Sequence, residues 1–173
     1  FYVSVDGNII PTENFLIQSE MSFPKDYKPT EKPEGLTTID NDGWGTEMVG
    51  EHQIKWRVFF LKETIKEEEL QGISIFSHGK LSQRPFMFNL TGGLPSQNGP
   101  EYMTGAVIAD YLDEFDEDVI STERQRLNWG HHHLATLEEW GKSRIRSLLR
   151  IWKDRRAEEK TKLIEDKVSD FSS

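Results

Sequence analysis

The chain has 173 residues, a formal net charge of −9 at pH 7, 35% hydrophobic and 29% charged residues, and no cysteine. This length fits one domain, or one domain with an appendage. The missing cysteines exclude disulfides and thiolate metal sites, which fits a cytosolic protein. The net negative charge argues against non-specific binding of nucleic acid by the whole surface, although it permits a local basic face.

No run of about eighteen apolar residues occurs, so we expect no transmembrane helix and no membrane partner. The first residues, Phe1 to Val5, lack the charged and apolar regions of a secretory signal. The chain does not begin with methionine, so we expect a fragment or a processed chain, and we expect it to be cytoplasmic.

The first fifty residues divide into two parts. Phe1 to Ile10 predicts a strand, a turn at Asp6-Gly7-Asn8 and the start of a second strand, because glycine adopts positive φ freely. Residues 11–50 show no sustained period and contain several prolines, which predicts a long irregular insertion. Its expected packing residues are Phe15, Phe23 and Tyr27.

The stretch Asn41-Asp42-Gly43-Trp44-Gly45 superficially resembles the DxGxG box of Bergerat-fold ATPases. Its aspartate is displaced by one position, and no helix with Glu and Asn precedes it. A tight glycine turn around Trp44 is the interpretation that the residues favour.

The centre of the chain has strand character. His52 to Lys62 alternates apolar and polar residues and predicts a half-buried strand, followed by an acidic connector or short helix to Gln71. Gly72 to Phe76 and Phe86 to Leu90 predict two paired strands around a polar turn that carries Lys80. After a flexible loop, Tyr102 to Leu112 predicts another buried strand.

The second half is predicted to be helical. Thr122 and Gln125 form a candidate capping box for a short helix that ends at Trp129 and Gly130. A second box, Thr136 with Glu139, precedes a long helix with apolar residues at helical spacing. These residues are Leu137, Trp140, Gly141, Ile145, Leu148, Leu149 and Trp152. Beyond them we expect a charged helix that projects from the core or pairs with a partner.

Two clusters of residues could suggest a metal site, but both are better interpreted as structural features. His131, His132 and His133 would point about 100° apart on a helix and would not converge on one ion, so a polar cap between two helices is favoured. The acidic residues of 110–118 lack the spacing of a calcium loop and are interpreted as a solvated turn, facing nearby arginines.

Two sets of basic residues remain as candidate sites. A stripe on the long helix could contact nucleic acid phosphates, or could be a solvated face, and consists of Lys142, Arg146, Arg150 and Lys153. Lys80 lies on its turn with Gln83 and Arg84 close behind, a group of donors that suits an oxyanion or phosphate. No Ser/His/Asp arrangement or Walker-type loop is suggested, so the residues alone do not describe a self-contained enzyme.

Three strings resemble the second domain of MORC-type GHKL ATPases, nearest to the prokaryotic members that often accompany restriction or phage-defence genes. They are residues 72–81, 102–110 and 118–125, and the helix with Leu137-Glu138-Glu139-Trp140-Gly141 and Trp152 to Arg156 fits as well. The resemblance covers about residues 50 to 160.

The resemblance implies a transducer domain, an α+β fold with the left-handed βαβ crossover of gyrase and mismatch-repair ATPases. In that family a preceding Bergerat domain binds ATP and Mg2+, a transducer lysine reaches the γ-phosphate, and two protomers dimerise on ATP. By position, Lys80 would be the switch lysine and Gln83 a helper. The Bergerat boxes are absent from these residues, so ATP would be held by an N-terminal ATPase domain outside the chain.

The sequence thus predicts an α+β fold with a mixed β-sheet packed by helices and a long charged C-terminal helix. Residues 1–152 would form the transducer-like domain, and residues 153–173 the projecting helix and tail. Two functions remain open: a transducer module for ATP-driven dimerisation in DNA- or defence-related work, and a non-enzymatic module that binds nucleic acid or a partner helix through the basic stripe.

Overall fold

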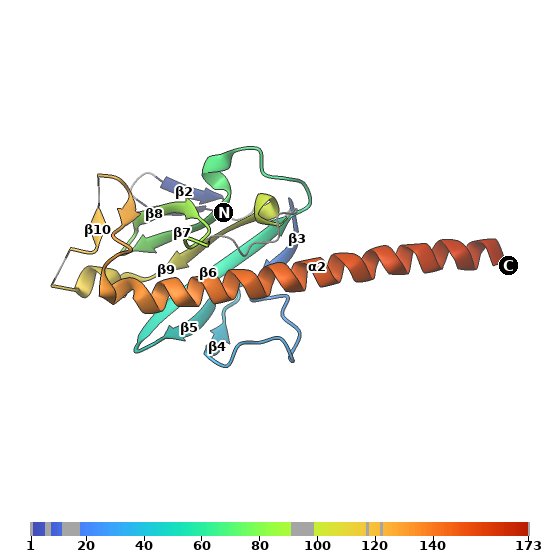
Figure 1. Ribbon diagram of the computed structural model, residues 1–173, viewed down its shortest axis with the longest axis horizontal. Coiled ribbons are helices and arrows are strands. Elements are labelled where there is room, and N and C mark those ends of the chain that lie inside the picture. Colours follow the sequence, from blue (N-terminus) through green and yellow to red (C-terminus); the bar gives the residue numbers. More distant parts are fainter. Residues whose placement is uncertain are drawn as a thin grey trace.

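A single β-sheet with one long helix across one of its faces forms the body of the protein (Figure 1). The computed structural model describes residues 2–5, 8–11, 18–90, 99–116, 118–121 and 123–172, with side chains from 18 to 169. The fold is α+β, as predicted, and the sheet mixes parallel and antiparallel pairs.

The sheet has seven strands in the order β4-β5-β6-β9-β7-β8, and β3 pairs with β6 outside this path. Only β7 and β9 pair in parallel among its described pairs. The strands are β3 (Ser19–Phe23), β4 (Leu36–Ile39), β5 (Gly45–Val49), β6 (His52–Leu61), β7 (Gly72–Ser77), β8 (Lys80–Phe86) and β9 (Met103–Ile108).

Smaller elements surround the sheet. Two antiparallel hairpins are formed by β1 (Tyr2–Val5) with β2 (Asn8–Pro11) and by β10 (Ile120–Ser121) with β11 (Arg126–Leu127). The described residues also form the 3₁₀ turns η1 (Glu68–Leu70), η2 (Pro100–Tyr102), η3 (Asp110–Glu114) and η4 (His132–Leu134). The last leads directly into α2 (Ala135–Ser172), a helix of 38 residues.

Several predicted elements are confirmed. The alternating stretch His52 to Lys62 becomes β6, and the parts of the predicted first hairpin that are described form β1 and β2. Beyond Trp56, β6 is buried on both faces, so the prediction of a half-buried strand is wrong for this part, and even Arg57 is only 4% exposed. The acidic connector contains only the short turn η1.

Other predictions are wrong. Residues 11–50 include β3, β4 and β5, because short strands completed by sheet neighbours need no long periodic run. Within this region Phe23 and Tyr27 are buried as expected, whereas Phe15 lies outside the described residues. The second strand of the β7 hairpin covers Lys80–Phe86 and not Phe86 to Leu90, where Phe88 and Asn89 take positive φ of 54° and 57° in a turn.

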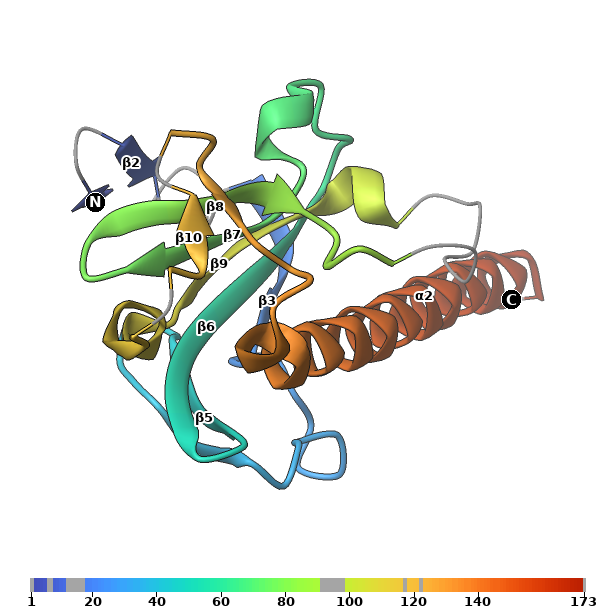
Figure 2. The same cartoon turned by 60° about the vertical axis from the view of Figure 1, so that its left-hand side comes forward.

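The short helix predicted for 122–129 is a hairpin instead. Thr122 lies outside the described residues, Gln125 has a φ of 48°, and β10 and β11 pair across this turn. The chain from β10 to α2 passes alongside β8 (Figure 2), where the backbone N–H of Leu127 donates to Gln83 Oε1 at 3.0 Å. This side-chain anchor competes with helix formation.

The crossover that the resemblance implies is not observed among the described residues. Between the parallel strands β7 and β9 these residues form β8 and the 3₁₀ turn η2, and residues 91–98 lie outside the described part. The α-helix described in full, α2, follows the last strand of the sheet.

Helix α2 packs its apolar stripe on the sheet as predicted from the spacing. Ile145 and Leu148 are fully buried, and the Trp152 ring stacks on Phe60 of β6 with centroids 5.4 Å apart. Gly141 is required at its position, because a Cβ there would lie 2.0 Å from Cδ1 of Phe88. Burial of these side chains supplies the hydrophobic stabilisation of the helix–sheet contact.

A buried carboxylate lies between α2 and the sheet. Glu47 of β5 is 3% exposed, and its Oε1 accepts a hydrogen bond from Trp56 Nε1 at 3.0 Å. Its Oε2 accepts from Trp140 Nε1 at 2.7 Å and from the guanidinium of Arg144, with which it forms an ion pair. Glu47 thus joins one residue of the sheet to two residues of the helix. Each of these three side chains donates a hydrogen bond to its carboxylate.

Along the described part of the chain, no helix combines the length and the apolar character needed to cross a bilayer.

Replacing Glu47 with glutamine tests this contact. Glu47→Gln leaves the mostly buried Arg144 without its counter-charge, so we expect the free energy of unfolding to fall by about 3 kcal/mol or more in urea denaturation. The matched control is Glu138→Gln, which removes the charge from a partly exposed ion pair with Lys142 at 3.7 Å. The control is expected to change stability by less than about 0.5 kcal/mol, and equal effects would contradict the role of Glu47.

Candidate functional site

The candidate site is the tip of the β7–β8 hairpin. His78 and Gly79 form a two-residue turn with φ of 47° and 79°, the positive values that the tight turns of twisted hairpins require. Lys80 follows as the first residue of β8 and is exposed. The Ser77–Lys80 pair closes the ladder, so the lysine projects from a hydrogen-bonded hairpin.

Two aspartates of η3 hold this tip in place. The backbone N–H of His78 donates to Asp110 Oδ1 at 2.7 Å. Asp113 Oδ2 accepts from Ser77 Oγ at 2.7 Å and lies 2.8 Å from His78 Nδ1. Asp110 and Asp113 are exposed, as expected for a solvated turn, but the expectation that they face arginines is wrong, because both carboxylates bind the hairpin.

Ser77, His78 and Asp113 do not form a nucleophilic triad. Ser77 is completely buried, and its hydroxyl donates to Asp113 and not to the imidazole. A catalytic serine needs a hydrogen bond to the histidine that removes its proton. The three side chains therefore act as a clamp on the turn.

The clamp changes the protonation of its members. The hydrogen bond to Asp113 raises the pKa of His78 above its usual value, and the charges of Asp110, Asp113 and Glu114 act in the same direction. For Asp113, burial opposes ionisation, but hydrogen bonds from Ser77 and His78 and the positive charges of His78 and Lys80 lower its pKa. Both shifts favour the His78 imidazolium beside an ionised Asp113.

The two shifts define a pH window for the clamp. A raised histidine pKa contributes stability that is complete below 6.5 and is lost as pH rises through the folded-state pKa. A lowered aspartate pKa contributes stability above 3.8 that is lost as pH falls through its folded-state pKa. The charged pair is thus strongest between these two transitions, on the acidic side of neutrality.

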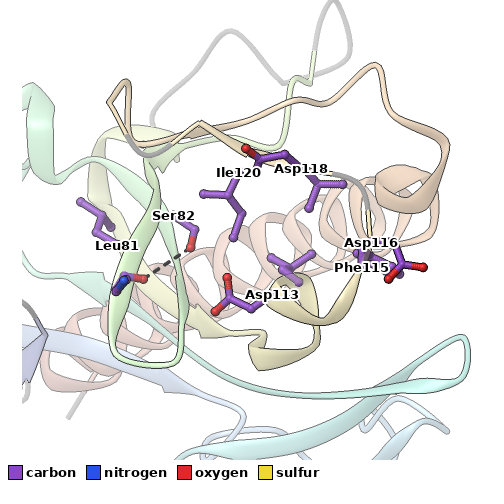
Figure 3. Close-up of a pocket in the computed structure, with 10 residues that line it drawn as sticks. Leu81, Ser82, Asp113, Phe115, Asp116, Asp118 and Ile120 are labelled. Carbon is purple, nitrogen blue, oxygen red and sulfur yellow. Dashed lines mark hydrogen bonds between the residues drawn. The ribbon is translucent and has the colours of Figure 1, made fainter.

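A pocket of about 300 Å³ lies beside the hairpin, between β8 and the segment that runs from η3 to β10. Figure 3 shows Ser82 and Leu81 on the β8 side and Asp113, Asp116, Asp118 and Ile120 on the other. Lys80 also lines it and makes no ion pair within 4.0 Å in the described residues. The pocket therefore combines one cationic side chain with several carboxylates.

Gln83, the predicted helper of Lys80, is engaged elsewhere. Its Oε1 accepts from the backbone N–H of Leu127 and from Trp129 Nε1, both at 3.0 Å. Its Nε2 donates to the Arg84 carbonyl at 3.1 Å, and the residue is 7% exposed. Gln83 connects β8 to β11, and this role accounts for its place in the sequence without a phosphate ligand.

The predicted basic stripe lies on α2, the helix whose apolar stripe packs on the sheet. Arg146 and Arg150 are exposed, and Lys142 and Lys153 are partly buried. Lys142 is paired with Glu138. The structure thus places the four residues on one helix, whereas Lys80 lies on β8, the edge strand at the opposite end of the sheet from β4.

The three histidines come together, and the expectation that they diverge is wrong. They precede α2 in an extended residue and a 3₁₀ turn, so the 100° spacing does not apply, and their ligand atoms lie within 4.8 Å of one another. The predicted cap between two helices is therefore a cap at the start of one helix, α2, because the segment before it is the β10–β11 hairpin and not a helix. The predicted capping box of Thr136 with Glu139 is also wrong, because α2 begins at Ala135 and Thr136 lies inside its first turn. The cap that is observed belongs to η4, where His131 Nδ1 accepts the N–H of His133 at 3.2 Å.

The three histidine rings lie against one another in a triangle. Their centroids are 4.2 to 4.9 Å apart with interplanar angles of 21° to 40°, and His133 stacks on Phe115 at 4.2 Å. His131 Nδ1 already accepts a hydrogen bond, so this lone pair is not directed at a shared point. Tetrahedral zinc requires three such lone pairs to converge at about 2 Å from one point.

The turn before β5 matches its prediction. Asp40 Oδ1 accepts the backbone N–H groups of Asp42 and Trp44, both at 2.9 Å, and Gly43 has a φ of 89°. Trp44 is 9% exposed and packs with Phe76 and Ala106. This is the glycine turn around a tryptophan that the sequence favoured over a nucleotide box.

Comparisons with protein-family models, with curated proteins and with solved structures returned no match. The geometry of the described residues is accordingly the basis for the functional inference.

The clamp makes a direct prediction for His78. In an NMR titration of the imidazole protons, the pKa of His78 should lie above 6.5 and should fall in the Asp113→Asn variant, which loses the charge partner. Asp116→Asn removes a carboxylate from the same pocket that does not contribute to the shift, and serves as the control. An unchanged His78 pKa in Asp113→Asn would show that the hydrogen bond does not govern its protonation.

Proposed function

We propose that this chain is a transducer-type module that presents Lys80 to an anionic group bound by a neighbouring domain. The observation that carries the proposal is the placement of Lys80 at the exposed tip of a hairpin whose turn is held by Asp110 and Asp113. A cation fixed on a rigid turn loses little conformational freedom when it meets its ligand.

The resemblance to MORC-type GHKL ATPases supports one identity for that ligand, the γ-phosphate of ATP. Developing charge on a transferred phosphoryl group is stabilised by a positioned lysine. ATP and Mg2+ would be bound by an ATPase domain of Bergerat type that lies outside these residues, since the glycine turn at 40–44 is a structural turn. In this role the module would relay ATP-driven dimerisation to DNA- or defence-related work in the cytoplasm.

Carboxylates line the pocket together with Lys80 and would repel a bound anion, which favours a transient over a constant contact with phosphate. The charge of Lys80 contributes to the lowered pKa of Asp113, yet the two side chains form no ion pair within 4.0 Å in the described residues. A phosphate therefore need not break a salt bridge to reach the lysine.

The test is Lys80→Ala in a protein that carries both this module and the ATPase domain. We expect ATP hydrolysis to fall about 100-fold, as for removal of a single group that stabilises transition-state charge, and ATP-driven dimerisation to weaken. Lys66→Ala, at another exposed lysine, is the control and should leave both unchanged. Unaltered hydrolysis and dimerisation in Lys80→Ala would refute the proposal.

A second candidate function is binding of nucleic acid by the basic stripe of α2. It is favoured by the exposure of Arg146 and Arg150, one turn apart on the helix. Contacts to phosphates release counterions, so affinity should fall steeply as salt is raised.

Fluorescence anisotropy with duplex DNA at 50 and 200 mM salt tests this candidate. We expect binding to weaken with salt and to be lost in the double reversal Arg146→Glu/Arg150→Glu. The control Lys160→Glu/Lys162→Glu makes an equal charge change further along the same helix. Binding whose affinity does not change with salt, or that persists after the charge reversal at residues 146 and 150, would exclude the stripe as the DNA-binding site.

A further inference from the structure

The C-terminal part of α2 leaves the body of the protein and is surrounded by solvent (Figure 1). Every described side chain from Ala157 to Ser169 is exposed. Among these are three large apolar side chains, Leu163, Ile164 and Val168, with exposed fractions of 62%, 57% and 59%. We call residues 157–169 the tail.

The tail has a seam on one face. Ala157, Thr161, Ile164 and Val168 are separated by four, three and four residues, the spacing of the a and d positions of a heptad repeat. Ala157 and Ile164 then occupy d positions, and Thr161 and Val168 occupy a positions. The preceding seam positions are Arg150 and Asp154, so the apolar part begins where the helix has left the sheet.

The seam lies on the part of α2 that has left the sheet, where every described side chain is exposed. Around the helix Ile164 lies about 120° from Trp152 and about 160° from Leu148, but about 60° from the buried Leu149, since each residue turns the helix by 100°. A second helix can therefore lie along the tail without displacing the contact between α2 and the sheet.

Charged residues border the seam with opposite signs on its two sides. The g positions are Lys153, Lys160 and Lys167, and the e positions within the tail are Glu158 and Glu165. In coiled coils these flanking positions set the choice and orientation of the partner through interhelical ion pairs.

This charge pattern selects one orientation for self-association. In a parallel, in-register pair, each g residue meets the e residue five positions later, so Lys160 meets the partner's Glu165 and Lys153 meets the partner's Glu158. In an antiparallel pair, g meets g and e meets e, which brings lysines against lysines and glutamates against glutamates. We propose that the tails of two copies of this chain associate as a short parallel coiled coil.

The first experiment uses the absence of cysteine from the chain, because each substitution then supplies a single thiol. Ile164→Cys and Ala157→Cys should each form a disulfide-linked dimer under mild oxidation, since d positions of parallel helices face each other. Glu159→Cys and Asp166→Cys, at f positions on the outer face, are the matched controls and should remain monomeric. All four sites are exposed, and circular dichroism of each variant should show an unchanged helix content.

Mixing distinguishes the orientations. An antiparallel pair would cross-link Ala157→Cys with Val168→Cys, and would not join Ala157→Cys to itself. In a parallel pair, Ala157→Cys links to Ala157→Cys and Val168→Cys links to Val168→Cys, with no preference for the disulfide between the two different variants. Cross-linking of seam sites no faster than of Glu159→Cys, or the antiparallel pattern, would overturn the proposal.

The second experiment reverses the flanking charges. Lys160→Glu should weaken self-association in sedimentation equilibrium by about fourfold, because a symmetric pair contains this contact twice and each exposed ion pair changes affinity about twofold. Lys160→Glu/Glu165→Lys should restore it. If the double variant is no better than the single one, the ion pairs do not direct the association.

These experiments need no nucleotide and no ATPase domain, so they are independent of the role proposed for Lys80. Loss of ATP hydrolysis in Lys80→Ala with intact cross-linking at Ile164→Cys would support both proposals. Cross-linking without any effect of Lys80→Ala on hydrolysis would support only the coiled coil.

Discussion

The buried carboxylate of Glu47 is the constraint on which the arrangement of sheet and helix depends. A carboxylate removed from water must be hydrogen-bonded and paired, and here the indole N–H groups of Trp56 and Trp140 and the guanidinium of Arg144 meet that requirement. These donors come from the sheet and from the helix, so they are brought together only when α2 is docked correctly. Apolar contacts such as Trp152 on Phe60 supply attraction, while Glu47 fixes the position of the helix along the sheet.

At the β7–β8 hairpin the charged groups are exposed to solvent, in contrast to the buried network around Glu47. Asp110 and Asp113 reach from η3 to hold the turn, which leaves Lys80 projecting from a supported base. The two polar networks thus have different uses. The buried one determines where the helix lies, and the exposed one presents a cation at the edge of the fold.

The sequence predicted those elements whose residues carry a sufficient local signal. Ten residues of alternating character defined β6, and the apolar positions from Leu137 to Trp152 defined the docked half of α2. It did not predict β3, β4 and β5, because strands of four or five residues are too short to show a sustained period and are completed by pairing with neighbouring strands. The apolar run from Phe86 to Leu90 was wrongly predicted as a strand. Phe88 is buried, but it lies in a turn.

The candidate site was predictable in part. The placement of Lys80 on a glycine turn followed from local pattern, whereas its clamp joins residues more than thirty positions apart. Gln83 shows the limit of that reasoning, because its partners Leu127 and Trp129 belong to a segment predicted as a helix. Glu47 carried no signal at all, since a glutamate in a short strand ordinarily faces solvent.

The continuity of α2 has a mechanical consequence. No break is described between its docked half and its exposed half, so the helix can act as a lever arm. Residues 157–172 extend about 24 Å at 1.5 Å per residue, and a rotation of the docked half by about 10° would move the tip by about 4 Å. A small adjustment of the helix on the sheet would therefore be amplified several-fold at the end of the arm.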